Sequence, residues 1–154
     1  MSAIENLDGG GLEAAIVART DHAVIVADAE GTIRFWNPAS EAMFGWSRDD
    51  AVGRSLDLIV PEKLRERHWD GYQRVMETGE TDYAGRTLAV PAIRADGSRI
   101  SVEFTVTLLP AADGGVGGIA AIMRDVTAQW EERRALTRRL AELERELRQR
   151  EQTA

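Results

Sequence analysis

The sequence predicts an α+β domain built around one antiparallel sheet and followed by a long, highly charged helix. The clearest strand is 100–108, where five apolar residues alternate with four polar ones, so that one face is buried and the other is wet. Turn signals at 28–31 and at Asp96-Gly97 each lie between segments typical of strands, which indicates two hairpins. From Thr127 to Ala154 there are seven arginines and six glutamates, a composition typical of a solvated helix.

Composition narrows the class of protein before any motif is considered. The chain has 154 residues, of which 44% are hydrophobic, enough for a real core in one domain. It has no cysteine, which excludes disulfides, zinc ribbons and thiol catalysis. Its net charge of −7 disfavours nucleic-acid binding, and no apolar run approaches the roughly 20 residues of a membrane span. The acidic, glycine-rich N-terminus is unlike a signal peptide, so we expect a cytoplasmic protein without nucleic-acid or membrane partners.

The first half of the chain predicts short elements with defined ends. Asn37 can cap a helix that begins at Pro38, and Gly45 ends that helix. Ser47, three residues before Asp50, has the spacing of a second helix start. In chain order, the expected elements are an amphipathic helix at Gly11–Arg19, strands at Ala23–Ala27 and Thr32–Trp36, a helix at Pro38–Phe44, and a short helix that ends at Gly53.

The second half predicts one longer helix and the remaining strands. Pro61 opens a helix over Glu62–Thr78, and Gly79 ends it. His68 lies four residues from both Leu64 and Tyr72, so we expect it on the apolar stripe of this helix, while Trp69 packs elsewhere. The strands that follow are Arg86–Arg94, Ile100–Leu108 and Val116–Arg124.

The tail carries the spacing of a coiled coil. Leu136, Leu140, Leu143 and Leu147 are separated by 4, 3 and 4 residues, and the register extends back through Arg133, Gln129 and Val126. We therefore expect a parallel homodimer through 126–147, with 11–19 as a further contact. The alternative, a helix that packs on its own domain, stays open. The predicted organisation is an N-terminal flank at 1–20, a domain at 21–126 and a helix at 127–154.

Three stretches of the chain resemble PAS domains: GTIRFWNPASEAMFGWSRDDAVGRSL, RADGSRISVEFTVTLL and GIAAIMRDVTAQ. The matching positions are Asn37-Pro38 after the second strand, Gly45, Gly53, Asp96-Gly97 at a hairpin, and Asp125-Val126-Thr127 before the exit helix. The resemblance covers residues 21–129. It implies a five-stranded antiparallel sheet of order 2-1-5-4-3 with helices on one face, and a role in sensing and signal transduction.

The segment PEKLRERHWDGYQRV is similar to the long helix of the haem-binding, oxygen-sensing PAS domains of rhizobial kinases. This resemblance implies a b-type haem, with His68 as the iron ligand and Arg74 as partner of a haem propionate. Imidazole is a common axial ligand of haem iron. The residues that the resemblance brings to the haem, besides these two, are Tyr72, Tyr83, Leu88, Phe104 and Val106.

The sequence departs from that family on the distal side. The family's oxygen-binding arginine falls on Leu88, which has no donor, and Arg86 stands where a related haem group has methionine. The resemblance therefore implies carbon monoxide, nitric oxide or a redox signal more readily than stable oxygen binding. Flavin–thiol photochemistry is excluded, because the segment after Gly53 and the rest of the chain lack cysteine.

No catalytic pattern is found, so we do not expect an enzyme. The chain has no phosphate-binding loop, and its two histidines lack metal-ligand spacing. The alternative to a haem sensor is a cofactor-free PAS module for interaction and dimerisation, or a sensor of a small apolar metabolite. A third hypothesis is a fragment of a larger kinase or receptor. The downstream signalling partner is not identified by the sequence.

Overall fold

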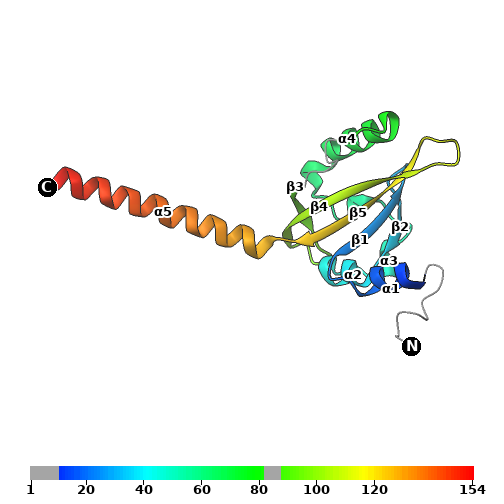
Figure 1. The fold of residues 1–154 in the computed structure, drawn as a ribbon, viewed down its shortest axis with the longest axis horizontal. Helices are drawn as coiled ribbons and strands as arrows, with labels where there is room; N and C mark the ends of the chain where they lie inside the picture. Colours follow the sequence, from blue (N-terminus) through cyan, green and yellow to red (C-terminus); the bar gives the residue numbers. More distant parts are fainter. Residues whose placement is uncertain (1–10, 82–87) are drawn as a thin grey trace.

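The computed structural model describes residues 11–81 and 88–154, which form one domain and a projecting helix (Figure 1). Its five-stranded antiparallel sheet has the order β2-β1-β5-β4-β3, as the resemblance implied. The strands are β1 (Ala23–Asp28), β2 (Ile33–Trp36), β3 (Leu88–Ile93), β4 (Arg99–Pro110) and β5 (Val116–Asp125). The helices are α1 (Gly11–Arg19), α2 (Pro38–Phe44), α3 (Arg48–Ala51), α4 (Arg65–Thr78) and α5 (Thr127–Thr153), with 3₁₀ turns η1 (Leu56–Leu58) and η2 (Glu62–Leu64).

The sheet is organised around its central strand β5, which pairs with β1 on one side and with β4 on the other. The close approach of β5 to β1 explains why residue 118 of β5 is a glycine. A Cβ atom on Gly118 would lie 2.3 Å from the carbonyl oxygen of Ala27, a distance that no side chain tolerates. Gly118 is therefore required by backbone packing and not by a turn.

One face of the sheet, called the inner face here, forms the core with the helices. Alternate residues of β1, β4 and β5 point into it, because successive side chains of a strand point to opposite faces. Helix α2 contributes Phe44, whose ring lies 5.5 Å from that of Trp36, and α4 contributes Tyr72. The buried inner-face residues of these three strands are Ala23, Ile25, Ala27, Ile100, Val102, Ala121 and Met123.

A single buried amide, that of Asn37, joins four segments. Its Oδ1 accepts hydrogen bonds from the Val24 amide at 2.9 Å and from the Ser40 amide at 3.0 Å. The Ser40 hydroxyl donates to the same oxygen at 2.7 Å. Its Nδ2 donates to the carbonyls of Val17 at 2.9 Å and of His22 at 3.0 Å. Asn37 thus caps α2, as the sequence predicts, and also fixes β1 and the end of α1.

Most predicted boundaries agree with the structure, and the differences have local causes. The helix expected from Glu62 begins as the 3₁₀ turn η2 and becomes α-helical at Arg65, because no side chain caps it. Strand β3 begins at Leu88; residues 86 and 87 of the strand expected from Arg86 lie outside the described residues. Strand β4 begins one residue earlier than expected, at Arg99, and continues toward its hairpin to Pro110. Strand β5 begins at Val116 as expected and ends one residue later, at Asp125.

Helix α5 points away from the domain (Figure 1). It has no buried residue. Leu136, Leu140, Leu143 and Leu147 are 64%, 59%, 40% and 58% exposed. Only the junction is tied down, at Val126, which is buried. In this structure the helix therefore does not pack on its own domain, contrary to the alternative considered from the sequence. Among the described residues, no helix is long and apolar enough to cross a membrane.

The Asn37 amide gives a test of how the fold is joined. Asn37→Asp keeps an acceptor for Val24 and Ser40 but replaces the donor to Val17 and His22 with a second acceptor. We expect it to lower the free energy of unfolding by about 3 kcal/mol, because two carbonyls lose their partner and a buried carboxylate replaces it. Urea denaturation measures this. The matched control Ser40→Ala, which loses only the hydroxyl, should cost about 1 kcal/mol; equal costs for both variants would contradict this role.

Candidate functional site

Helix α4 carries the candidate site on the side that faces the sheet. Gly79, with a φ of 68°, ends the helix in a left-handed conformation. Tyr72 is buried, and His68 and Trp69 are partly buried, so the helix presents these three rings inward. The expected place of His68 on the inner stripe of the helix agrees with its burial.

Polar contacts of three side chains hold α4 to the turn between β1 and β2 and to η1. Arg65 donates to the carbonyls of Asp57 and Val60, both at 3.2 Å. The Tyr72 hydroxyl donates to the carbonyl of Asp28, and the Trp69 indole Nε1 donates to Asp57 Oδ1 at 2.7 Å. The Trp69 ring also lies over Gly31, where a Cβ atom would come within 2.2 Å of the ring. Trp69 therefore packs at the site, against the sequence-based expectation that it packs elsewhere. Its partners, Asp57 and Gly31, are distant in sequence.

The charge of Asp28 is stabilised at this turn. Partial burial works against the carboxylate, but the amide of Thr32 and the guanidinium of Arg34 bind it, and together they hold the pKa of Asp28 below its ordinary value. Burial, with the charges of Asp28 and Glu30, raises the pKa of Tyr72, so its hydroxyl remains a donor. The contact from α4 to the β1–β2 turn is therefore present throughout the physiological pH range.

His68 carries a buried polar atom without a partner. Among the described residues, its Nδ1 has no hydrogen-bond partner. The ring centroid lies 4.8 Å from that of Trp69 and 5.9 Å from that of Tyr72. Burial lowers the pKa of His68, and the nearby Asp57 carboxylate only partly offsets this. The imidazole is thus neutral near pH 7, the form that binds a metal or accepts a hydrogen bond.

The other residues that the resemblance assigned to this site are only partly brought together. Phe104 pairs with Leu88 on one side and Met123 on the other, and Val106 pairs with Ala121. Phe104 and Val106 therefore share the inner face of the sheet. Arg74 is exposed on α4. Tyr83 and Arg86 lie outside the described residues, and of Leu88 only the backbone is described.

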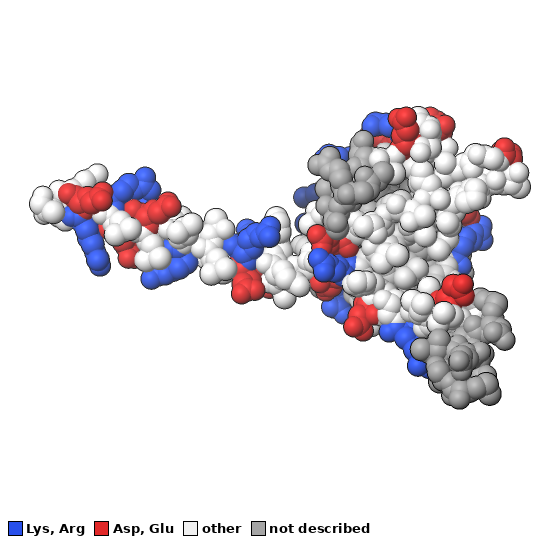
Figure 2. All heavy atoms as spheres, in the orientation of Figure 1, with Lys and Arg blue, Asp and Glu red and all other residues white. Residues whose placement is uncertain are grey.

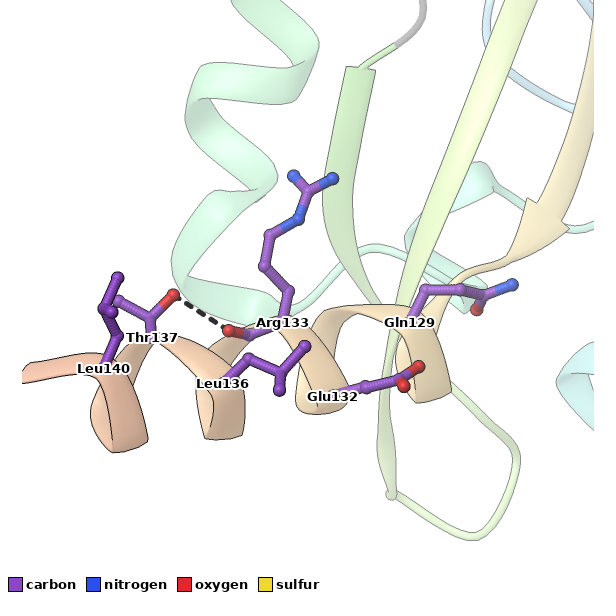
Figure 3. Close-up of a pocket in the computed structure, with 6 residues that line it drawn as sticks. All are labelled: Gln129, Glu132, Arg133, Leu136, Thr137 and Leu140. Carbon is purple, nitrogen blue, oxygen red and sulfur yellow. Dashed lines mark hydrogen bonds between the residues drawn. The ribbon is translucent and has the colours of Figure 1, made fainter. Parts of the chain in front are cut away.

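Two surface hollows lie away from His68. One follows α5 between Gln129 and Leu140, with Arg133 beside Leu136 (Figure 3). The other, of about 340 Å³, lies between the end of α4 and the β4–β5 hairpin. Its apolar lining residues include Met76, Leu108 and Val116, and Glu77 and Thr78 also line it. Sequence reasoning missed this groove; the glycines of the hairpin were the only signal for it. Within 11–81 and 88–154, no group of three His, Asp or Glu side chains could hold a metal ion.

The comparisons with known proteins identify the family. A family model described as PAS fold matches residues 17–131. The chain belongs to this family, and the match covers the whole sheet and the first turn of α5.

Curated relatives include parts of sensor proteins. A protein of Azorhizobium caulinodans is 38% identical over 138 residues, which are 89% of this chain and 18% of that protein. The sensor protein FixL of Bradyrhizobium diazoefficiens is 30% identical over 81% of this chain and 24% of its own length. The oxygen sensor protein DosP of Escherichia coli is 27% identical over 68% and 13%. The chain thus spans less than a quarter of the length of each.

Solved structures agree on the fold. The PAS domain of a Colwellia psychrerythraea protein superposes with a TM-score of 0.65 at 22% identity, over 75% of this chain and 95% of that one. An RNA-binding light-oxygen-voltage receptor superposes with a TM-score of 0.70 at 19% identity, over 92% and 40%. At these identities the likeness extends to the fold alone.

The lowered pKa of His68 predicts a pH-dependent stability. Because the folded state favours the neutral ring, the unfolded chain binds more protons than the folded chain below the ordinary pKa of 6.5. The free energy of unfolding therefore decreases as the pH is lowered through this range. We expect wild type to lose more stability than His68→Gln between pH 7.5 and pH 5.5, measured by urea denaturation. His22→Gln, at the exposed histidine, is the control and should follow wild type. Equal losses in wild type and His68→Gln would contradict the prediction.

Proposed function

We propose that this PAS domain is a sensory module that binds a b-type haem through His68 and passes the resulting change to α5. The observation that carries the proposal is the neutral, partly buried imidazole of His68, whose buried Nδ1 has no hydrogen-bond partner among the described residues. The similarity to FixL and DosP supports a sensing role for the domain. The module would act through contacts with a downstream protein, without catalysis of its own.

His68 fits the role of the ligand to the iron of a haem. His68 offers a nitrogen that no described group occupies, in surroundings that keep the ring unprotonated. The rings of Trp69 and Tyr72 lie beside it on the same helix. Phe104 and Val106 lie on the inner face of the sheet. Arg74 lies six residues after His68 on α4 and is exposed. A partner for a haem propionate at the protein surface must be exposed in this way. When bound, haem would supply an iron centre that responds to a diatomic gas or to oxidation.

The chain's own residues would bind and orient the group. His68 would hold it from α4, and Phe104 and Val106 would exclude water from the side of the sheet. Tyr72 would keep α4 attached to the β1–β2 turn through the Asp28 carbonyl. A change in the position of α4 therefore reaches β1 through one hydroxyl, and reaches β4 and β5 through their inward side chains.

The route from the sheet to α5 is short. Strand β5 ends at Asp125, and its carboxylate accepts a hydrogen bond from the Thr127 amide at 2.9 Å. The Thr127 hydroxyl binds the Ser101 amide of β4 at 2.9 Å, and the Val126 amide binds the Ser101 carbonyl at 2.8 Å. Displacement of β4 or β5 would thus change the direction of α5. In a dimer joined through 126–147, that change would re-register the leucine seam.

The groove near the β4–β5 hairpin supports a second candidate function, the sensing of a small apolar metabolite. Its lining by Met76, Leu108 and Val116 suits an aliphatic group. A PAS domain of a Cronobacter turicensis quorum-sensing receptor, which superposes with a TM-score of 0.56 at 14% identity, was solved in complex with C12:0. Of the two candidates, the haem is favoured because the imidazole of His68 is neutral and its buried Nδ1 has no hydrogen-bond partner among the described residues.

Reconstitution with haemin tests the haem proposal. The 154-residue protein should take up one equivalent and give a sharp absorption band at about 400 nm, because imidazole is a strong axial ligand. His68→Ala should lose the band or weaken haem affinity at least tenfold, while the exposed His22→Ala should behave as wild type. An absorption band that is unchanged in His68→Ala, or the absence of a band in wild type, would contradict the haem proposal. The metabolite sensor would then remain, and native mass spectrometry with aliphatic acids tests it.

Asp125 should separate signalling from binding. Asp125→Ala removes an acceptor at the junction and touches no residue of the His68 site, so we expect unchanged haem affinity. Hydrogen exchange of α5 amides should differ between free and haem-bound wild type, and this difference should be lost in the variant. Glu103→Ala, which removes a surface partner of Arg124 on the same sheet, is the control. An intact response of α5 in Asp125→Ala would contradict the proposed route.

A further inference from the structure

The groove between the end of α4 and the β4–β5 hairpin, called the hairpin groove here, is separate from the His68 site. Its volume of about 340 Å³ lies at the lower end of the range of about 300–1,000 Å³ that is usual for small-molecule pockets. Met76, which lines it, lies eight residues after His68, or about 12 Å along the helix at about 1.5 Å per residue. A ligand in the groove would therefore have a place of its own on the same helix.

The apolar wall of the hairpin groove comes from both the helix and the sheet. Leu108 lies two residues after Val106 on β4 and therefore on the same inner face of the sheet. Leu108, Met76 and Val116 are each partly buried. A Cβ atom on Gly79 would lie 3.7 Å from Val116 Cγ2, so the end of α4 and the start of β5 lie close together. The groove thus offers aliphatic surface to a hydrocarbon chain.

The charged part of the hairpin groove is an acid. Among the described residues that line it, Glu77 is the one with a charged side chain, and it is exposed. Its Oε1 accepts a hydrogen bond at 3.2 Å from Gln73 Nε2, which is a neutral donor. Within 11–81 and 88–154, Glu77 forms no ion pair, although Arg74 lies three residues before it on the same helix. Its negative charge therefore has no cationic partner in this part of the chain.

The end of α4 adds to the negative charge at the hairpin groove. A helix carries about half a negative elementary charge at its C-terminus, which a basic side chain in the last turn would offset. Helix α4 has no basic residue in its last turn, residues 75–78. Two more acids are next to lining residues in the chain, Glu80 after Gly79 and Asp113 before Gly114. In Figure 2, acidic side chains lie at the end of α4 and at the tip of the hairpin, and the surface between them is uncharged.

We propose that the hairpin groove binds a small aliphatic amine in its ammonium form. The hydrocarbon chain lies on Met76, Leu108 and Val116, and the ammonium group lies at Glu77 and the end of α4. An ammonium group has donors and no acceptor, so a carboxylate is a suitable partner for it. A fatty acid in the same place would bring its carboxylate against Glu77 and the negative end of the helix.

This inference rests on the second candidate function, the sensing of a small apolar metabolite, because it names the chemical class of that metabolite. It does not depend on the haem proposal.

Calorimetric titration of the 154-residue protein without added haemin tests the inference. The probes are octylamine, octan-1-ol and octanoate, which have equal chain lengths and differ in the charge of the head group. We expect octylamine to bind at least about tenfold more tightly than octanoate, with octan-1-ol between them. The amide chemical shifts of Gly79, Gly114 and Gly115 should change with octylamine, which locates the site. Octanoate that binds as tightly as octylamine would overturn the choice of an amine and leave the metabolite sensor standing.

Three variants separate the charged and the apolar parts of the groove. Glu77→Gln should weaken octylamine about threefold and leave octan-1-ol unchanged, because an exposed ion pair contributes modestly. Glu66→Gln, at an exposed acid in the first turn of the same helix, has the same change in net charge and should bind all probes as wild type does. Val116→Ala shortens the apolar wall and should weaken all three probes alike. Thermal unfolding of each variant checks that the fold is intact.

Failure of the amine inference and failure of the metabolite sensor give different results. If none of the three probes binds, the groove is not a ligand site, and both are overturned while the haem proposal is unaffected. If the preference for octylamine is the same in Glu77→Gln and in Glu66→Gln, the amine is attracted by the net charge of −7 and not by the groove, which overturns the inference.

Discussion

The buried amide of Asn37 is the constraint on which the arrangement of the domain depends. A side-chain amide has one acceptor and one double donor, and here both ends are used by backbone groups of different segments. Because the donor end binds Val17 and His22, α1 cannot move without a cost to the core. The direction of the apolar stripe on α1 is therefore set by the same side chain that starts α2.

Helix α4 is attached in a different way, and this difference suits a sensing element. Its inward side chains pack on the core, and its polar ties come from the Tyr72 hydroxyl, the Trp69 indole N–H and the Arg65 guanidinium, which donates to the carbonyls of Asp57 and Val60. These partners lie on the β1–β2 turn and in and after η1. A displacement of the helix that carries His68 would therefore act first on the β1–β2 turn and on η1.

The fold could be predicted from the sequence because its signals are local. The cap at Asn37, the Asp96-Gly97 turn and the alternation of β4 each specify an element within a few residues, and the resemblance supplied the strand order. The site was only partly predictable. The helical period correctly placed His68 on the inner side of the helix. The contact of Trp69 with Gly31 joins residues far apart in sequence, and the spacing of residues along the chain cannot predict such a contact. The groove beside Val116 was missed for the same reason.

Strand β5 joins the inner face of the sheet to the opposite face. Its residues Ala121 and Met123 are buried against the helices, and the residue between them, Ile122, points outward at 45% exposure. Since neighbouring side chains of a strand point to opposite faces, a twist of β5 caused at the core must also move Ile122. The same strand runs directly into Asp125 and α5. A ligand on the inner face would therefore move Ile122 and the start of α5 together, because both are carried by the same strand.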